Sequence, residues 1–490
     1  VDIVAMARPV TKYAACVTDP ATIRYHLERA LHEAVSGRPG PVWIDIPVDV
    51  QATVIDETTL VGFAPVPPVP APLTGPALDA AVAVIAARLA RAERPVLYAG
   101  AGVRLSGAAD DFARLVERLG IPVVSGFNAH DLVSTDHPLY VGRPGTIGDR
   151  PGNFAVQNAD CVLVVGCRLN IRQISYAWEN FARAADLIVV DVDAAELAKP
   201  TIRPALAVHA DAAMVIRGLL AVEWSGPGPA HRQWAAWCAE RKRRYPVVLA
   251  EYWQREGSVN PYCFGDALSR ALDDDDVIVT GDGTACIATF QSARLRGRQR
   301  LFSDSGCAPM GFDLPAAIGA CIARGRERVV CIAGDGSVML NVQELQTIRG
   351  YALPVKLFIF NNGGYLSMRL TQQNFFPDNP IGAGPESGVT FPDFGKLAAG
   401  FDLPFARLER NADLDAGIRS VLAQEGPMVC EVILDQAQPF SPRVSSKRLP
   451  DGRMVTAPLE DMFPFLPEVE LRANMLVPLV AHEVADRQGT

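Results

Sequence analysis

The chain has 490 residues, which is too long for a single hydrophobic core and favours roughly three domains. Its formal net charge is −9 and it carries no block of lysines or arginines, so nucleic acid and anionic membranes are not expected as main partners. No apolar run approaches the roughly 18 residues of a membrane span, and ten cysteines without a C-x-x-C pair favour a reducing cytoplasm.

The first predicted elements are one helix and one strand. Asp19 and Pro20 are typical of a helix start and Gly37 of a helix end, and residues 42–46 read as an apolar strand. One helix and one strand do not make a domain. Residues 1–63 are therefore predicted to be the C-terminal part of a domain that begins before Val1.

A Pro-rich stretch at residues 64–76 predicts a stiff linker. Residues 77–224 then alternate between helical segments and short apolar strands, which predicts a parallel sheet covered on both faces. The strands are expected at residues 96–99, 123–125, 161–165 and 187–191. Residues 225–257 begin with a Gly/Pro-rich break and are predicted as a linker region.

The third block, residues 258–440, alternates in the same way. Its strands are expected at residues 277–280, 329–333, 355–360 and 428–434. Residues 441–490 carry prolines and charges and are predicted as a C-terminal arm. The predicted fold class is α/β, with three doubly wound parallel-sheet domains of which the first is partial.

Two of these strands end in polar residues suited to a metal and a phosphate. The strand at 329–333 runs into Gly334-Asp335-Gly336-Ser337, and the strand at 355–360 ends in Asn361-Asn362. The carboxyl ends of parallel strands meet at one edge of a sheet, where α/β proteins bind ligands. A Gly-rich turn before a helix favours phosphate, and carboxylate and amide oxygens suit Mg²⁺.

A second Gly-Asp-Gly turn occurs at residues 281–283. It also follows an apolar strand, but no pair of asparagines lies at the corresponding distance. A Gly-Asp-Gly sequence alone is as often a simple turn as a ligand site. We therefore predict that only the turn at 334–336 binds the metal.

The spacing in the second site, Gly-Asp-Gly followed by 24 residues and then Asn-Asn, resembles the signature of acetohydroxyacid-synthase-like thiamine-diphosphate enzymes. The resemblance implies that Asp335, Asn362 and the Gly364 carbonyl bind Mg²⁺. It also implies a set of contacts to thiamine diphosphate, made by Gly334, Asp335, Gly336, Ser337, Asn362, Gly364 and Tyr365.

Residues 308–319 resemble the family stretch that ends in MGFGLPAAIGA. In the family the methionine supports the bent form of the cofactor, and a carbonyl two residues earlier accepts a hydrogen bond from its 4′-amino group. These roles fall on Met310 and Ala308. Cys307-Ala308-Pro309 departs from the family pattern, and core packing is the alternative role for Met310.

The middle block resembles the central domain of the same family, which binds FAD in several members and ADP or nothing in others. Glycines at strand ends permit close approach of a dinucleotide. The implied nucleotide-binding residues are Gly100, Gly102, Arg104, Gly166, Arg168, Asp191, Asp193 and Asp211. FAD is expected, and an exposed arginine remains the alternative interpretation of Arg168.

Residues 36–47 resemble the end of the family's pyrimidine-binding domain. The glutamate that activates the cofactor precedes this region in the family, and Glu28, Glu33 and Glu57 are not assigned to its role. Roughly a hundred further residues before Val1 are expected, with a separate subunit or an inactive paralogue as alternatives. The resemblance also implies a homodimer or homotetramer whose active site lies between subunits.

The resemblance implies an acetolactate-synthase-like carboligase that decarboxylates a 2-oxo acid, pyruvate first, and transfers two carbons to a carbonyl acceptor. Typical members carry a tryptophan where this chain has Thr371, so housekeeping branched-chain synthesis is not expected. A C–C hydrolase, a decarboxylase, a pyruvate oxidase and an inactive regulatory protein remain alternatives. Lys447, Arg448 and Arg453 lie in the C-terminal arm, which could fold over the site as a lid that attracts anionic substrates. The alternative is a charged tail exposed to solvent.

Overall fold

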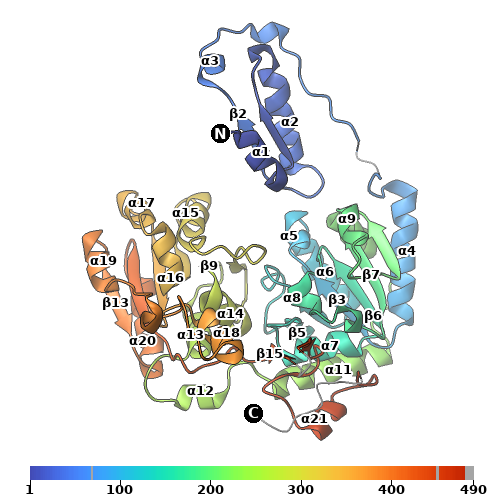
Figure 1. Cartoon of the computed structure of the whole chain (residues 1–490). Helices are drawn as coiled ribbons and strands as arrows, with labels where there is room; N and C mark the ends of the chain where they lie inside the picture. Colours follow the sequence, from blue (N-terminus) through green and yellow to red (C-terminus); the bar gives the residue numbers. More distant parts are fainter. Residues whose placement is uncertain (68–69, 449–451, 481–490) are drawn as a thin grey trace.

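The computed structural model describes residues 1–67, 70–448 and 452–480 (Figure 1). It confirms the predicted α/β class, since two six-stranded parallel sheets carry helices on both faces. A smaller N-terminal unit, drawn in dark blue at the top of Figure 1, contains a two-stranded parallel sheet. Among the described residues, no helix is both long and apolar enough to span a bilayer.

The N-terminal unit (residues 1–63) contains one more strand than predicted. Its elements are α1 (Ile3–Ala7), β1 (Tyr13–Cys16), α2 (Ile23–Val35), β2 (Val42–Asp45) and α3 (Val48–Gln51). Strand β1 pairs in parallel with β2. Asp19 caps a 3-10 turn at Pro20–Thr22 by accepting the main-chain N–H of Ala21 at 3.0 Å, so α2 begins one turn later than the sequence indicates.

The central unit (residues 77–224) is built around the sheet β5-β4-β3-β6-β7-β8. Its strands are β3 (Pro95–Ala99), β4 (Val123–Ser125), β5 (Tyr140–Gly142), β6 (Cys161–Val165), β7 (Asp186–Asp191) and β8 (Leu206–His209). Its helices are α4 (Gly75–Arg91), α5 (Gly102–Leu105), α6 (Ala109–Leu119), α7 (Arg150–Asn158), α8 (Ile171–Ile174), α9 (Ala194–Leu197) and α10 (Ala212–Ala221). The outer strands β5 and β8 are short and were not predicted, and the same holds for the edge strands of the other six-stranded sheet, at Arg300–Phe302 and Phe405–Leu408.

Residues 225–257, predicted as a linker, hold two helices, α11 (Pro229–Arg244) and α12 (Ala250–Gln254). Helix α11 packs against α7 and β5 of the central unit. Trp234 is buried there, and its indole N–H donates to the Pro95 carbonyl at 3.0 Å. Burial of this aromatic side chain explains why the stretch is helical rather than extended.

The C-terminal α/β unit (residues 258–440) has the strand order β10-β9-β11-β12-β14-β13. Its strands are β9 (Val277–Thr280), β10 (Arg300–Phe302), β11 (Val329–Gly334), β12 (Val355–Asn361), β13 (Phe405–Leu408) and β14 (Met428–Ile433). Its helices are α13 (Pro261–Ala271), α14 (Gly283–Ser292), α15 (Asp313–Ala323), α16 (Asp335–Val338), α17 (Glu344–Gly350), α18 (Leu366–Phe375), α19 (Phe394–Gly400) and α20 (Leu414–Ala423). The predicted strands 329–333 and 355–360 are adjacent as β11 and β12.

The C-terminal arm, drawn in dark red in Figure 1, returns to the central unit beside α7 and α11. It contains β15 (Arg443–Val444), β16 (Ser446–Arg448), β17 (Met454–Thr456), β18 (Met462–Phe463) and α21 (Glu468–Ala473). The buried carboxylate of Glu460 accepts from Gln157 at 2.7 Å and pairs with Arg183 at 2.8 Å. The side chains of the proposed lid residues Lys447 and Arg448 lie outside the described part of the structure, and so do residues 449–451 as a whole.

Candidate functional site

Asp335 lies at the carboxyl end of β11 and is 2% exposed. Its Oδ2 accepts the main-chain N–H groups of Asn362 and Gly364, both at 3.0 Å, and its Oδ1 accepts that of Gly336 at 2.8 Å. Burial raises the pKa of Asp335 to about 6, against the opposing effect of these N–H donors. A cation beside this carboxylate would favour its ionised form.

Asn362 follows β12 and supplies an amide oxygen without a protein partner. Its Nδ2 donates to Thr284 Oγ1 at 3.3 Å, and within the described residues its buried Oδ1 has no hydrogen-bond partner. A buried oxygen of this kind is costly unless a ligand or water satisfies it. Carboxylate, amide and main-chain oxygens together form the hard donor set that Mg²⁺ prefers.

No group of three His, Cys, Asp or Glu side chains in the described ranges could hold a metal ion. A cation at this edge would therefore depend on Asp335 together with amide and main-chain oxygens. Mg²⁺ tolerates so few carboxylates because it usually shares its ligands with substrate phosphates and water. The residues at the edge fit a Mg²⁺–diphosphate group.

The first Gly-Asp-Gly turn lies at the same edge as the second. Strand β9, which leads into it, is the neighbour of β11, and the N–H of Gly281 donates to the Ile332 carbonyl at 2.9 Å. Thr284, in the first turn of α14, accepts the Asn362 amide. The sequence predicted no role for residues 281–283 at the metal site. They lie beside it because the strand before them, β9, pairs with β11.

Two of the predicted cofactor-binding residues are glycines that the local packing requires. A Cβ atom on Gly336 would lie 2.2 Å from Tyr365 Cε1, so the tyrosine ring covers the turn. Gly364 has φ +143°, and a Cβ atom there would lie 2.3 Å from the Ala383 carbonyl oxygen. Gly334, in contrast, has room for a side chain, because its nearest contact would be 3.9 Å away.

Met310 and Ala308 lie in the loop between β10 and α15. Both are partly exposed, and Ala308 has φ +51°, an unusual conformation for a non-glycine residue. The hydroxyl of Ser337, a predicted cofactor-binding residue, accepts the N–H of Gly311 at 2.9 Å and donates to Asp313 Oδ2 at 2.5 Å. This hydroxyl therefore joins the Met310 loop to the turn at 334–337.

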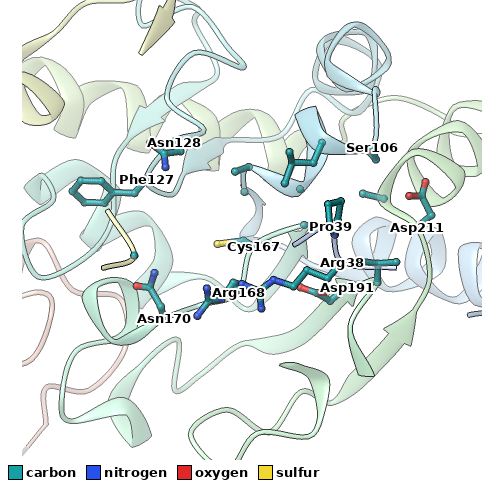
Figure 2. Close-up of a pocket in the computed structure, with 18 of the residues that line it drawn as sticks. Arg38, Pro39, Ser106, Phe127, Asn128, Cys167, Arg168, Asn170, Asp191 and Asp211 are labelled. Atoms are coloured by element: carbon teal, nitrogen blue, oxygen red, sulfur yellow. The ribbon is translucent and has the colours of Figure 1, made fainter. Parts of the chain in front are cut away.

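A cavity of about 510 Å³ lies at the carboxyl ends of the central strands (Figure 2). Six of the predicted nucleotide-binding residues line it, namely Gly100, Gly102, Gly166, Arg168, Asp191 and Asp211. Arg104 does not line it, because its guanidinium pairs with Asp131 at 3.0 Å. Asp193 does not line the cavity either. It caps α9 by accepting the N–H of Ala195 at 2.9 Å.

The glycines of this cavity are required by the packing of the protein itself. A Cβ atom on Gly100 would lie 2.1 Å from the Gly166 carbonyl oxygen, and one on Gly102 would lie 2.7 Å from Gly166 Cα. Their first requirement is therefore the close approach of two main-chain segments. Close approach of a ligand to this backbone is a consequence of the same packing.

Residues from both neighbouring units complete the cavity. Arg38 and Pro39 reach it from the N-terminal unit, and Ser305 and Gly306 reach it from the C-terminal α/β unit. Figure 2 shows Arg38 and Arg168 side by side near Asp191, with Phe127 and Asn128 at the opposite end from Asp211. The sequence analysis missed Arg38, although it noted the motif that contains it, because only the tertiary structure brings it to the central sheet.

The two cavity arginines share one acidic partner. Glu196 of α9 pairs with Arg38 at 2.9 Å and with Arg168 at 2.8 Å. Asp211 caps α10 by accepting the N–H groups of Ala213 and Met214. Burial raises the pKa of Asp191, which also accepts the N–H of Asp193 at 2.9 Å. The guanidinium pair gives one end of the cavity the bidentate donors that bind phosphate groups well.

Comparison with known protein families agrees with this arrangement. Residues 82–219 match the model of the thiamine pyrophosphate enzyme central domain. Residues 280–432 match the C-terminal TPP binding domain of the same enzymes. The matched regions contain the cavity-lining strands of the central unit and the edge that carries Asp335 and Asn362.

The relatives are acetolactate synthases. The chain is 32% identical over 444 residues to the acetolactate synthase isozyme 1 large subunit of Escherichia coli, which covers 91% of this chain and 76% of that protein. It is 31% identical over 461 residues to the probable acetolactate synthase 2 of rice, 91% of this chain and 68% of that protein. The chain therefore belongs to the thiamine-diphosphate-dependent enzyme family of the acetolactate synthase large subunits.

Proposed function

We propose that this enzyme decarboxylates a 2-oxo acid, with pyruvate as the first candidate, and transfers the two-carbon unit to a carbonyl acceptor. The observation that carries the proposal is the pairing of Asp335 with Asn362, whose amide oxygen is left without a protein partner among the described residues. Thiamine diphosphate, when bound, supplies the carbon nucleophile and the electron sink that such a decarboxylation needs.

Each residue of the edge has a definite task in this proposal. Asp335, Asn362 and the Gly364 carbonyl would hold Mg²⁺, and the turn at 334–337 would bind the diphosphate. Met310 would support the organic part of the cofactor, and the Ala308 carbonyl would accept from its amino group. Conversion of cofactor binding into catalysis further requires the activating carboxylate, which we assign to none of the glutamates of this chain.

We propose an acceptor other than that of housekeeping branched-chain synthesis. The support is Thr371 in α18, where typical acetolactate synthases carry a tryptophan that favours 2-oxobutyrate. Thr371 is exposed, and its hydroxyl donates to the Ser367 carbonyl at 2.9 Å rather than toward a substrate. Competition between pyruvate and 2-oxobutyrate as acceptors tests this point, and a strong preference for 2-oxobutyrate would contradict it.

Incubation of the Mg²⁺- and thiamine-diphosphate-loaded protein with pyruvate alone separates the candidate reactions. Acetolactate supports the carboligase. Acetaldehyde would instead indicate a decarboxylase, and peroxide would indicate an oxidase. Cofactor binding without turnover of pyruvate, together with cleavage of a cyclic diketone in a separate assay, would favour a C–C hydrolase. No turnover of any substrate would favour an inactive regulatory protein.

We propose FAD as the occupant of the central cavity. The cavity extends from Asp211 to Ser305 and Gly306, which lie in the same loop as Ala308 and Met310, so a long dinucleotide suits it better than a mononucleotide. Arg38 and Arg168 would hold its diphosphate. An absorbance spectrum of the purified protein tests this proposal, and binding of ADP with no affinity for FAD would overturn it.

We further propose a homodimer or homotetramer with the active site between subunits. Helix α2 exposes Leu27, Leu31 and Val35 at a spacing of four residues, which forms an apolar stripe suited to contact with further protein. Light scattering during gel filtration measures the assembly. A monomer that retains full activity would contradict this proposal.

A further inference from the structure

The two peptide groups of Gly311, the residue after Met310, are each held by a side chain. The N–H of Gly311 donates to Ser337 Oγ at 2.9 Å, and the Gly311 carbonyl accepts from Asn341 Nδ2 at 2.7 Å. Gly311 has φ +88°, and a Cβ atom there would lie 2.9 Å from both Asn341 Nδ2 and Leu340 Cβ. Two side chains and a close steric fit thus fix the direction of the chain at Met310.

Asp313 determines how Ser337 takes part. An ionised carboxylate only accepts hydrogen bonds, so the Ser337 hydroxyl donates to Asp313 Oδ2, at 2.5 Å, and keeps a lone pair for the Gly311 N–H. Asp313 is fully buried, and its other oxygen accepts the N–H of Leu314 at 3.0 Å. The family stretch that this region resembles has glycine at this position, so the carboxylate is a feature of this chain.

We propose that Asp313, Ser337 and Asn341 are positioning residues that fix the two peptide groups of Gly311, next to Met310, and thereby set the affinity for the organic part of thiamine diphosphate. The inference rests on the proposed contact between Met310 and that cofactor. Asp335 and Asn362, in contrast, are proposed to act on the Mg²⁺–diphosphate part of the ligand. Loss of any of the three side chains is therefore expected to weaken binding of the organic part of the cofactor and to leave binding of the diphosphate part unchanged.

The test compares two ligands, thiamine diphosphate and inorganic diphosphate, each titrated with Mg²⁺ into the full chain by calorimetry. Asn341→Ala should weaken binding of thiamine diphosphate about fivefold to tenfold, the range expected for loss of one hydrogen bond. Binding of inorganic diphosphate should be unchanged. Asn341→Leu nearly keeps the size of the side chain and removes its donor without adding charge, so it should behave like Asn341→Ala and guards against a packing defect.

Gln346→Ala is the matched control, because this exposed side chain lies on the adjoining helix α17. It should leave both affinities unchanged. If Asn341→Leu weakened the binding of both ligands equally, the three side chains would have only a general structural role, and the inference would be wrong. Unchanged binding of both ligands would also overturn it. Failure of the unchanged protein to bind thiamine diphosphate, while inorganic diphosphate still binds, would instead refute the proposed function.

Discussion

The Asp335 carboxylate accepts the main-chain N–H of Asn362 at 3.0 Å, although 27 positions separate the two residues in the sequence. The bond joins the ends of β11 and β12, so the acid and the amide are held together before any ligand binds. Pre-organisation of this kind lowers the free-energy cost of ordering the protein ligands when a metal binds.

Asp335→Asn should lower the affinity for Mg²⁺ and thiamine diphosphate at least about 100-fold, since it removes a charged ligand from the site. The same change can turn an amide NH₂ toward the N–H groups of Asn362 and Gly364, which then lose their acceptor. The melting temperature of the protein should therefore also fall. Calorimetric titration measures the first effect. Asp282→Asn in the neighbouring turn is the control, and an equal loss in that variant would contradict the assignment.

Arg38→Met should weaken FAD binding about tenfold, equivalent to ~1.4 kcal/mol, because it removes one of the two cavity guanidiniums. Quenching of flavin fluorescence measures the dissociation constant. Arg24→Met changes an exposed arginine of the same unit, which forms an ion pair with Glu28 on its own helix and does not line the cavity. If both variants bind FAD equally well, Arg38 has no part in holding the dinucleotide.

Lys356 of β12 should make stability depend on pH in the alkaline range. Its ammonium group is buried and donates to the carbonyls of Gln424 and Gly426, and burial lowers the pKa of Lys356 from 10.5 to about 8. Between these values the unfolded chain binds more protons than the folded one, so this residue makes the free energy of unfolding rise with pH from about 8 to about 10.5.

The measurement is urea unfolding of the unchanged protein and of Lys356→Met across this pH range. Tyrosines and cysteines whose pKa is raised act in the opposite direction, and the difference between the two proteins removes their contribution. The difference should shift in favour of the unchanged protein as pH rises. A difference that is constant with pH would contradict the depressed pKa.

Phe264→Ala should destabilise the C-terminal α/β unit by about 3–5 kcal/mol, because it leaves a cavity in a close-packed core. The ring is fully buried and lies edge-on to Phe358 and Phe360, with centroid distances of 5.2 and 4.9 Å. Phe376→Ala, at a residue 61% exposed, should change stability by less than about 0.5 kcal/mol. Thermal unfolding compares the two, and similar melting temperatures would argue against this packing.

The sequence by itself determined the fold class and the Asp335–Asn362 pair. Both depend on local patterns: apolar strands alternate with helices, and the polar residues follow two successive strands directly. Parallel strands deliver their carboxyl ends to one edge, so the spacing along the chain was enough to predict their meeting. The strands β5, β8, β10 and β13, which lie at the edges of the two six-stranded sheets and have three or four residues each, were not predicted.

Only the tertiary structure decided which side chains reach the two sites. Ser337 turned toward Gly311 and Asp313, Arg104 turned toward Asp131, and Arg38 arrived at the cavity from another unit. These choices depend on contacts between residues far apart in the chain, where a buried polar group takes whichever partner the packing brings within reach. The local sequence pattern therefore predicts where strands end, whereas contacts between distant residues determine which partners the side chains there bind.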